Sequence, residues 1–454
     1  MANAYGLDFG TSNSSIATAG GGQTSVLPVD SAAATPQVAS SVLYIDRQGG
    51  VSIGASAVRD FVEQNRNREI KKRTIASGRT VETELGEEML RIEADVDMPG
   101  RFFQSTKSFL KDESFEGTQV FDSFMTIEEL VSKFLVTLKQ RADALNGRAL
   151  GSVMMGRPVF FSRDAGKDRL AEQRLRDAAK IAGFKHVEFL FEPIGAALAY
   201  EATIRREELA FVFDFGGGTL DFTVARIGPG RAGHAERAGD ILAVGGVVIG
   251  GTTFDEEVMK KRLMKYFGAG YEGRMDGGKS LGMPAWILAE LQSWYRIPLL
   301  NERKTLRVID ELIRSAASGR DELLALLSLV RGNYGWELFQ QIELAKIALT
   351  DHSKARILFE RDRINVREDI TRREFESIIS TQLRRVGEEI DQTIASAGLT
   401  PGDIDVVIRT GGSSLIPAVQ RLLVSRFGAD KIVQQEVFTS VVAGLALAAD
   451  LRFN

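Results

Sequence analysis

The feature that most constrains the fold of this chain is a short pattern that occurs twice. Tyr5 to Ser15 reads YGLDFGTSNSS and Phe211 to Val224 reads FVFDFGGGTLDFTV, so each has an apolar entry, an aspartate, an aromatic residue and a glycine. The two aspartates, Asp8 and Asp214, lie 206 positions apart (214 − 8). This spacing is far longer than a solenoid repeat and suits two halves of a two-domain protein.

The second copy predicts a strand, a turn and a second strand. Phe211 to Phe213 is an apolar run typical of a buried strand, and Leu220 to Val224 alternates apolar and other residues. Between them Gly216 to Gly218 remove three Cβ atoms and leave consecutive N–H groups facing one concavity that an anion can enter. Asp214 and Asp221 flank this concavity and require a cation, for which Mg²⁺ carried in with a nucleotide is suited. The alternative is a glycine-rich hairpin turn with two solvated aspartates.

Composition places the chain among ordinary globular proteins and narrows its chemistry. It has 454 residues, 44% of them hydrophobic, with 57 basic against 61 acidic side chains, so no global field recruits nucleic acid or a membrane surface. The absence of cysteine excludes disulfides, thiolate catalysis and cysteine zinc sites. The dispersed histidines, His186, His234 and His352, are interpreted as structural or exposed. No signal peptide or spanning segment is recognised, so a cytoplasmic protein is expected.

Strands and helices alternate through the first two hundred residues. Helical spacing of apolar residues predicts helices over Met125 to Leu145, closed by Gly147, and over Arg169 to Gly183. Strands are predicted over Ser152 to Phe161 and His186 to Phe191. This alternation predicts an α/β sheet with crossover helices.

The second half has a similar organisation. A strand is predicted over Asp240 to Gly251, followed by a helix that begins near Phe254 and Asp255 and is capped by Thr252 or Thr253. Further on, Val406 to Ile408 is an apolar strand that runs into Thr410-Gly411-Gly412-Ser413, and a helix from Pro417 to Phe427 follows.

The segment from Lys260 to Phe339 is predicted to be rich in helix. It contains all three tryptophans, Trp286, Trp294 and Trp336. Two interpretations stay open: the tryptophans are buried aromatics of a helical subdomain, or they mark a surface for a protein partner.

Six motifs in order resemble the ATPase domain of DnaK-type heat-shock chaperones, and most strongly its shortened members of the YegD type, within the superfamily of actin and the sugar kinases. The motifs are DFGTSNS (Asp8 to Ser14), FEPIGAALAY (Phe191 to Tyr200), DFGGGTLD (Asp214 to Asp221), GGTTFDEEV (Gly250 to Val258), IELAKIALT (Ile342 to Thr350) and TGGSSLIP (Thr410 to Pro417). The resemblance implies an α/β, two-lobed, actin-like ATPase fold of duplicated ribonuclease-H-like domains, with Mg-ATP in a cleft between the lobes.

The resemblance also implies roles for the residues around the triphosphate. Asp8 and Asp214 would hold the water shell of Mg²⁺, with Asp221 close by. Lys107 would reach the γ-phosphate and Glu192 would lie near the attacking water, so both join Asp214 and Thr219 as candidate catalytic residues. The phosphates would be cradled by Gly10, Thr11, Ser12 and Asn13 on one side and by Gly216, Gly217, Gly218 and Thr219 on the other. Without the resemblance, Lys107 is an ordinary exposed lysine and Glu192 a plain helix start.

The adenosine would lie against a helix of the second half. Glu343, Lys346, Ile347 and Thr350 fall on one helical face. The glutamate and lysine would bracket the ribose, and Ile347 stands where the family has a basic residue on adenine, so cation–π stacking is lost. The pocket would be completed by Gly250 and Gly251 and, on the opposite wall, by Gly411, Gly412 and Ser413.

Three departures from the family limit which of its functions can be expected of this chain. The chain ends at Asn454, so the linker, peptide-binding domain and lid are expected to be absent. Pro158 matches a switch proline of the family, but Glu172 stands where an arginine relays nucleotide state. The segment between Asp255 and Glu343 is longer than in the family, which predicts an insertion that binds something else.

The resulting domain prediction has two lobes and a returning helix. The first lobe spans 1–205 with an outer subdomain at about 40–120. The second spans 206–436 with an enlarged helical outer subdomain at about 255–365. Residues 437–454 form a C-terminal helix that returns to the first lobe.

The leading functional hypothesis is a slow Mg-ATP hydrolase that acts through lobe closure on an unknown protein partner, without binding nucleic acid or membrane. Three alternatives stay open: an actin-like filament former, a small-molecule kinase of the same fold, and a pseudo-ATPase that binds nucleotide without cleaving it.

Overall fold

The computed structural model describes residues 3–83, 86–95, 97–201, 203–229, 231, 237–274, 280–434 and 439–453. The chain forms two compact units: unit 1 comprises residues 1–60, 101–253 and 379–454, and unit 2 comprises residues 61–100 and 254–378. These units divide the chain at other places than the predicted lobes, whose boundaries stay a prediction. No helix within the described ranges is long and apolar enough to cross a membrane. His234 lies outside the described residues.

Two of the sheets in unit 1 share one topology. In each, the first strand is antiparallel to the second and parallel to a later crossover strand, which is itself parallel to an edge strand. The orders are β13-β12-β1-β2-β3 and β22-β21-β14-β15-β16. The strands of the first sheet are β1 (Ala4–Phe9), β2 (Asn13–Gly20), β3 (Gln23–Val26), β12 (Ser152–Arg157) and β13 (His186–Phe191). Those of the second are β14 (Glu208–Phe215), β15 (Leu220–Ile227), β16 (Ile241–Val247), β21 (Val406–Thr410) and β22 (Ile432–Gln434). The predicted duplication is therefore present in the strand order.

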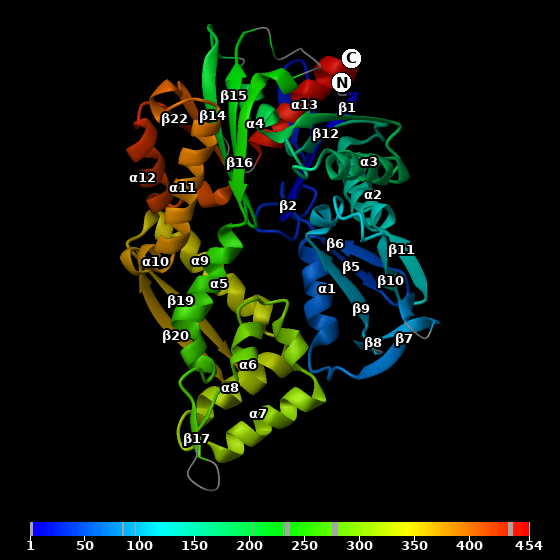
Figure 1. Cartoon of the computed structure of the whole chain (residues 1–454), viewed down its shortest axis with the longest axis vertical. Helices are drawn as coiled ribbons and strands as arrows, with labels where there is room; N and C mark the ends of the chain where they lie inside the picture. The colour runs from blue at the N-terminus through cyan, green and yellow to red at the C-terminus, as the bar shows by residue number, and fades with distance from the viewer. Residues whose placement is uncertain are drawn as a thin grey trace. The chain divides into compact units, whose positions relative to one another are not determined.

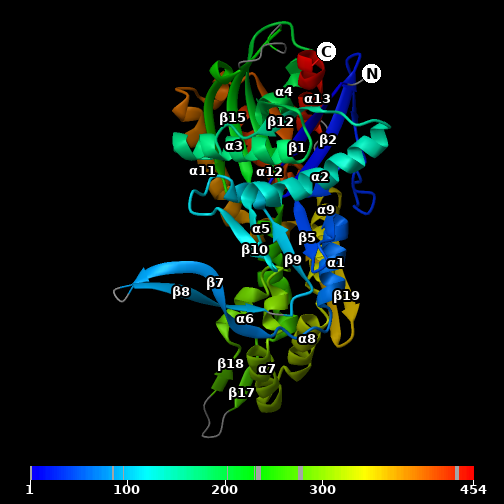
Figure 2. The same cartoon turned by 90° about the vertical axis from the view of Figure 1, so that its right-hand side faces the viewer.

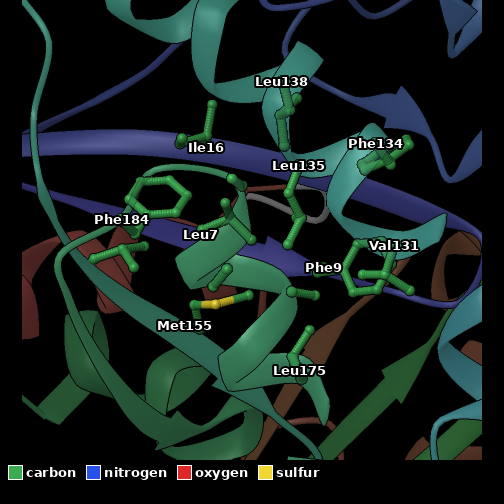
Figure 3. Close-up of a cluster of buried hydrophobic side chains, with 14 of the residues drawn as sticks. Leu7, Phe9, Ile16, Val131, Phe134, Leu135, Leu138, Met155, Leu175 and Phe184 are labelled. Carbon is green, nitrogen blue, oxygen red and sulfur yellow. The ribbon is translucent and has the colours of Figure 1, made fainter. Parts of the chain in front are cut away.

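Two helices cover the first sheet and bury its core. α2 (Ile127–Asn146) begins with a capping box between Thr126 and Glu129 and ends at Gly147, whose φ of 72° suits glycine. The helix predicted over Met125 to Leu145 is confirmed. α3 (Ala165–Ile181) packs beside it. Figure 3 shows the side chains that meet between these helices and the sheet, namely Leu7, Phe9, Ile16, Val131, Phe134, Leu135, Leu138, Met155, Leu175 and Phe184.

The second sheet is covered on both faces. Figure 1 shows α11 (Ser380–Ser396) and α12 (Pro417–Phe427) on one side, and α4 (Glu192–Glu201) with α13 (Ser440–Phe453) on the other. The ring of Phe211 lies 5.6 Å from that of Phe222 and 5.1 Å from that of Phe427. Val406 and Ile408 pack with α4 and α13. Burial on both faces explains the continuous apolar run of β14.

The C-terminal helix α13 is packed tightly inside unit 1. It contacts α4, β1 and β2. A Cβ atom on Gly444 would lie 1.9 Å from the carbonyl oxygen of Gly195, so only glycine permits this approach of the two helices. The helix thereby ties the end of the chain to its first strand.

Other short elements complete unit 1 and its borders. They are β4 (Ala39–Ser40), β5 (Val42–Asp46), β6 (Val51–Ile53), α1 (Ala55–Asn65), β9 (Gly100–Gln104), the 3₁₀ turn η1 (Thr106–Phe109), β10 (Gly117–Val120), β11 (Ser123–Thr126), α5 (Gly251–Val258) and the 3₁₀ turn η7 (Gly412–Leu415). β5 pairs with β6 and β9, and β10 pairs with β11.

Unit 2 combines helices with small sheets. The antiparallel strands β7 and β8 form a long ribbon, drawn in blue in Figure 2. The elements are β7 (Lys72–Thr83), β8 (Gly86–Asp95), β17 (Glu272–Arg274), β18 (Ser280–Gly282), α6 (Ala285–Glu290), α7 (Arg303–Ser315), α8 (Arg320–Arg331), α9 (Gly335–Asp351), β19 (Lys354–Arg361), β20 (Ile364–Thr371) and α10 (Arg372–Ile378). The predicted helix-rich segment is confirmed by α6 to α9.

The tryptophans of this segment have different environments. Trp294 is 9% exposed, and its ring lies 4.8 Å from that of Trp336, which is partly buried. Trp286 is 47% exposed. The buried interpretation therefore holds for Trp294, and the partner-surface interpretation stays a prediction for Trp286.

Candidate functional site

Two hairpin loops of unit 1 repeat one local geometry. In the first, the N–H of Gly10 donates to the carbonyl oxygen of Asn13 at 3.0 Å. In the second, the N–H of Gly216 donates to the carbonyl oxygen of Thr219, also at 3.0 Å. Each glycine stands two positions after the aspartate of its motif. The pattern that occurs twice in the sequence thus folds into the same turn twice.

The two loops approach each other closely. A Cβ atom on Gly218 would lie 2.9 Å from the Oγ of Ser12, and one on Gly217 would lie 3.3 Å from the Cβ of Ser12. A side chain at position 218 would therefore require the hydroxyl of Ser12 to move, which favours glycine there. The structure brings together the two predicted phosphate loops, which consist of Gly10, Thr11, Ser12 and Asn13 and of Gly216, Gly217, Gly218 and Thr219.

Two further turns fix the second loop. The N–H groups of Gly251 and Thr252 donate to the carbonyl oxygens of Gly216 and Gly217, at 3.1 and 2.9 Å. The Oγ of Ser413, in the turn after β21, donates to the carbonyl oxygen of Gly216 at 3.2 Å. These hydrogen bonds fix the carbonyl oxygens of Gly216 and Gly217, and consecutive N–H groups of a glycine turn fixed in this way can bind an anion.

The start of α5 differs from the prediction. The sequence placed it near Phe254, with Thr252 or Thr253 as the cap, but the helix begins at Gly251. The Oγ of Thr253 instead accepts a hydrogen bond from the N–H of Gly250 at 3.2 Å. The N–H groups of Gly251 and Thr252 bind the distant glycine loop, and this favours a helix that begins earlier than predicted. A prediction from neighbouring residues does not include such distant contacts.

Lys107 forms a buried ion pair with Glu192. Its Nζ lies 2.6 Å from Oε1 of Glu192, and the two side chains are 7% and 19% exposed. Lys107 belongs to the turn η1, and Glu192 begins α4 directly after β13. The structure therefore joins two candidate catalytic residues that lie 85 positions apart. Their catalytic roles stay a prediction.

The carboxylates around this pair have raised pKa values. Burial, followed by repulsion from Glu192, raises the pKa of Asp8 to about 7, although Lys107 opposes the shift. Burial, followed by repulsion from Asp221 and Asp8, raises the pKa of Asp214 well above its usual range.

Two more groups complete these electrostatics. Desolvation by the surrounding protein, followed by repulsion from Glu192, raises the pKa of Asp221. The residue is nevertheless exposed, so water screens this shift. Burial by itself lowers the pKa of Lys107, yet attraction to Glu192 and Asp8 outweighs it and the pKa rises. The site thus concentrates negative charge around one ammonium group.

This donor set fits a hydrated magnesium ion. Asp8, Asp214, Asp221 and Glu192 present hard oxygen atoms, and their crowding favours a divalent counter-charge beyond that of Lys107. Within the described ranges, no three acidic or imidazole side chains are grouped closely enough to hold a metal ion directly. The role predicted for Asp8 and Asp214 is to contact the water shell of the ion.

The residues predicted for the adenosine side lie in unit 2, on α9. The Nζ of Lys346 donates to Oδ2 of Asp255 at 2.8 Å, and both side chains are largely buried. Burial raises the pKa of Asp255 to about 6, although Lys346 opposes the shift. Glu343 is exposed and Ile347 is 55% exposed. That these residues and Thr350 complete one nucleotide site with the phosphate loops stays a prediction.

Sequence reasoning missed two contacts at these sites. The sequence pattern marks Asp255, the partner of Lys346, only as a helix start, because a pair 91 positions apart has no spacing signal. It marks Thr252, whose N–H binds the carbonyl oxygen of Gly217, only as a cap. Both residues lie in the motif GGTTFDEEV, so the motif itself was the one available signal. The predicted residues Gly250 and Gly251 lie at the start of α5, and Gly411, Gly412 and Ser413 lie at the 3₁₀ turn after β21, all in unit 1.

Comparison with known proteins gives one consistent answer. The chain is 26% identical over 432 residues to the chaperone protein dnaK of Cyanidioschyzon merolae, covering 94% of this chain and 58% of that protein. It is 28% identical over 426 residues to the chaperone protein DnaK of Thermus thermophilus, covering 93% of this chain and 56% of that protein. The chain therefore spans little more than half the length of these curated relatives.

The family model described as Hsp70 protein matches residues 4–276 and 335–452. The matched ranges contain both repeated hairpins, Lys107, Glu192, the glycine turn after β21 and α9. The predicted resemblance to DnaK-type ATPase domains, and with it the α/β actin-like fold class, is confirmed. This chain belongs to the Hsp70 family.

Proposed function

We propose that this chain binds Mg-ATP and slowly hydrolyses it to ADP and phosphate, as a chaperone-type ATPase. The observation that carries the proposal is the close approach of the two repeated hairpins beside the ion pair of Lys107 and Glu192. They approach so closely that a Cβ atom on Gly218 would lie 2.9 Å from the Oγ of Ser12. Facing glycine loops bind phosphate through N–H groups, and phosphoryl transfer requires mainly positioning and charge neutralisation.

A magnesium ion bound with the nucleotide would neutralise charge that develops on the phosphates. Asp8 and Asp214 would hold its water shell, with Asp221 close by. Their raised pKa values support this role, because crowded carboxylates that repel one another gain most from a nearby cation.

The remaining residues would act on the terminal phosphate and the water. The ammonium group of Lys107 would stabilise negative charge on the γ-phosphate, and Glu192, oriented by Lys107, would accept a hydrogen bond from the attacking water. Asp214, whose pKa is raised by burial and by repulsion from Asp221 and Asp8, would take the proton. The hydroxyl of Thr219 donates to Asp221 at 3.1 Å and would hold that carboxylate beside the phosphates.

The output would be a closing and opening of the predicted lobes that a protein partner reads. The family model leaves residues 277–334 unmatched, and this segment contains α6, α7, α8 and the exposed Trp286. We place the partner surface there. The proposal takes the cytoplasm as the compartment.

The test measures inorganic phosphate released from Mg-ATP by the purified chain, beside the variants Asp214→Ala and Lys107→Ala. We expect slow turnover by the native chain and a loss of about 100-fold or more in both variants. Circular dichroism and thermal unfolding check that the variants stay folded. Bound ATP without any released phosphate would remove hydrolysis from the proposal and leave a nucleotide-binding protein.

A further inference from the structure

Arg157 links four segments at one end of the first sheet. It is the last residue of β12, and its side chain is 12% exposed. Its Nη2 lies 2.8 Å from Oδ2 of Asp168, and its Nη1 pairs with Glu172; both carboxylates belong to α3. Its Nε donates to the carbonyl oxygen of Pro158 at 3.1 Å.

Two aromatic rings enclose the same guanidinium group. Its carbon lies 5.3 Å from the ring centre of Phe161 and 5.4 Å from that of Phe191. A planar cation held by two carboxylates and stacked on two rings has little freedom to move. Arg157 therefore fixes the end of β12 against α3 and against the end of β13.

The end of β13 is where Glu192 is placed. β12 and β13 are parallel, and Arg157 stands opposite Phe191, the residue directly before Glu192. A Cβ atom on Gly156 would lie 3.0 Å from Cγ of Glu192, so the end of β12 is the surface against which Glu192 rests. Arg157 thus lies opposite the residue that precedes Glu192. Gly156, the residue before Arg157, lies against the side chain of Glu192.

We infer that Arg157 is a positioning residue that sets the direction of Glu192, and through it the ion pair with Lys107. This inference rests on the proposed function, in which Glu192 orients the attacking water. A displacement of about 1 Å in such a group lowers turnover by about 100-fold while substrate binding changes little. Arg157 touches neither Glu192 nor Lys107, so it acts through the two strand ends.

Arg176, on α3 itself, supplies a matched control. It also pairs with Glu172, at 3.0 Å, and its guanidinium group lies 4.7 Å from the ring centre of Phe189. Its Nη1 donates to the carbonyl oxygen of Val187. Arg176 therefore joins α3 to β13 with the same chemistry as Arg157, but further from the strand end that holds Glu192.

The experiment compares Arg157→Gln, Arg157→Lys and Arg176→Gln in the full chain. Steady-state phosphate release gives kcat and KM for Mg-ATP, and hydrogen exchange with mass spectrometry reports the backbone around residues 190–194. We expect Arg157→Gln to lower kcat by about 10- to 100-fold with KM changed less than about threefold. Arg157→Lys recovers little, because an ammonium group cannot make the bidentate and stacked contacts. Arg176→Gln should keep kcat within about twofold.

Exchange around residues 190–194 should rise in Arg157→Gln and stay unchanged in Arg176→Gln. Equal effects of the two glutamine variants would reduce the role of Arg157 to general support of α3 and overturn the inference. Unchanged kcat and exchange in Arg157→Gln would overturn it as well. Absence of turnover in the native chain would refute the proposed function alone, and the exchange comparison would then decide whether Arg157 fixes the start of α4.

Discussion

The sheets of unit 1 that contain β1 and β14 share one topology, but their first hairpins carry different chemistry. The turn is the same, with an N–H to carbonyl hydrogen bond of 3.0 Å in each loop. Opposite Asp8 on the neighbouring strand stands Ser15, whereas opposite Asp214 stands Asp221. The repeated backbone therefore fixes where a ligand would lie. The side chains and charges that differ between the two hairpins decide the chemical role of each half.

The largest expected effect tests whether the two aspartates are equivalent. Asp214→Asn should lower phosphate release by about 100-fold or more, and Asp8→Asn by a smaller factor of about 10, because only Asp214 has the second role of proton acceptor. The measurement is steady-state turnover at saturating Mg-ATP. Asp112→Asn, in an exposed turn of unit 1, serves as the control and should turn over as the native chain does. Equal losses in both hairpin variants would make the halves chemically equivalent.

The second prediction uses the raised pKa of Asp8. This carboxyl group has a pKa of about 7 in the folded chain against 3.8 when unfolded, so its protonation stabilises the fold below about pH 4, and this contribution is lost as pH rises through 7. Asp8→Asn places a side chain that stays neutral at this position, so the variant does not lose this stability as pH rises. Without nucleotide, the variant should be more stable than the native chain by at most about 4 kcal/mol at pH 8, and by less than half as much at pH 5.

Thermal unfolding at the two pH values, with a chelator present, measures whether Asp8→Asn is more stable than the native chain. Asp369→Asn is the comparison, because Arg356 and Lys354 hold the pKa of that exposed carboxyl group below its usual range. Removing this carboxylate should not raise the stability of the chain at pH 8. A variant at Asp8 that is less stable than the native chain at pH 8 would show that the carboxylate is already compensated without nucleotide.

The third prediction separates the loops by their need for glycine. Gly218→Ala should destabilise the chain by about 1 kcal/mol, because its Cβ would lie 2.9 Å from the Oγ of Ser12. Ser12→Gly in the same chain should recover most of that loss, as measured by urea unfolding. Gly216→Ala is the matched control in the same loop, since its Cβ would meet no atom closer than 3.5 Å. Additive effects of the changes at Ser12 and Gly218 would mean that the two loops do not meet in solution.

The smallest expected effect lies outside the two sheets, on α9. Ile347 is 55% exposed and stands at the position predicted to face adenine. Ile347→Arg should raise the affinity for ADP by about threefold, the size of an exposed cation–π contact. Leu344→Arg adds the same charge to a residue of α9 that is 58% exposed and should leave the affinity unchanged. Calorimetric titration with ADP distinguishes a base contact from a general effect of charge.

Local features of the fold followed from the sequence. The strand, glycine turn and strand around Asp214 appear as β14 and β15, and the helix predicted from Pro417 to Phe427 has those bounds. Both were predictable because apolar spacing, glycine and a proline at the first helical position act over a few residues.

Contacts between distant segments could not be predicted in the same way. The approach of Gly218 to Ser12, the pair of Lys107 with Glu192 and the hydrogen bonds that begin α5 at Gly251 depend on packing across the chain. The resemblance supplied the grouping of Lys107 with Glu192, but no pattern indicated that the pKa of Asp8 would rise, since that depends on burial.

The position of α13 has a consequence for the order in which the chain folds during synthesis. β1 is made well before β12, with which it pairs, and before α13, which covers it and begins only at Ser440. The face of the first sheet that α13 covers therefore stays unburied until residue 440 and those after it have been made. During that time its apolar strands are exposed to other proteins in the cell, so this member of a chaperone family is itself expected to be a late folder.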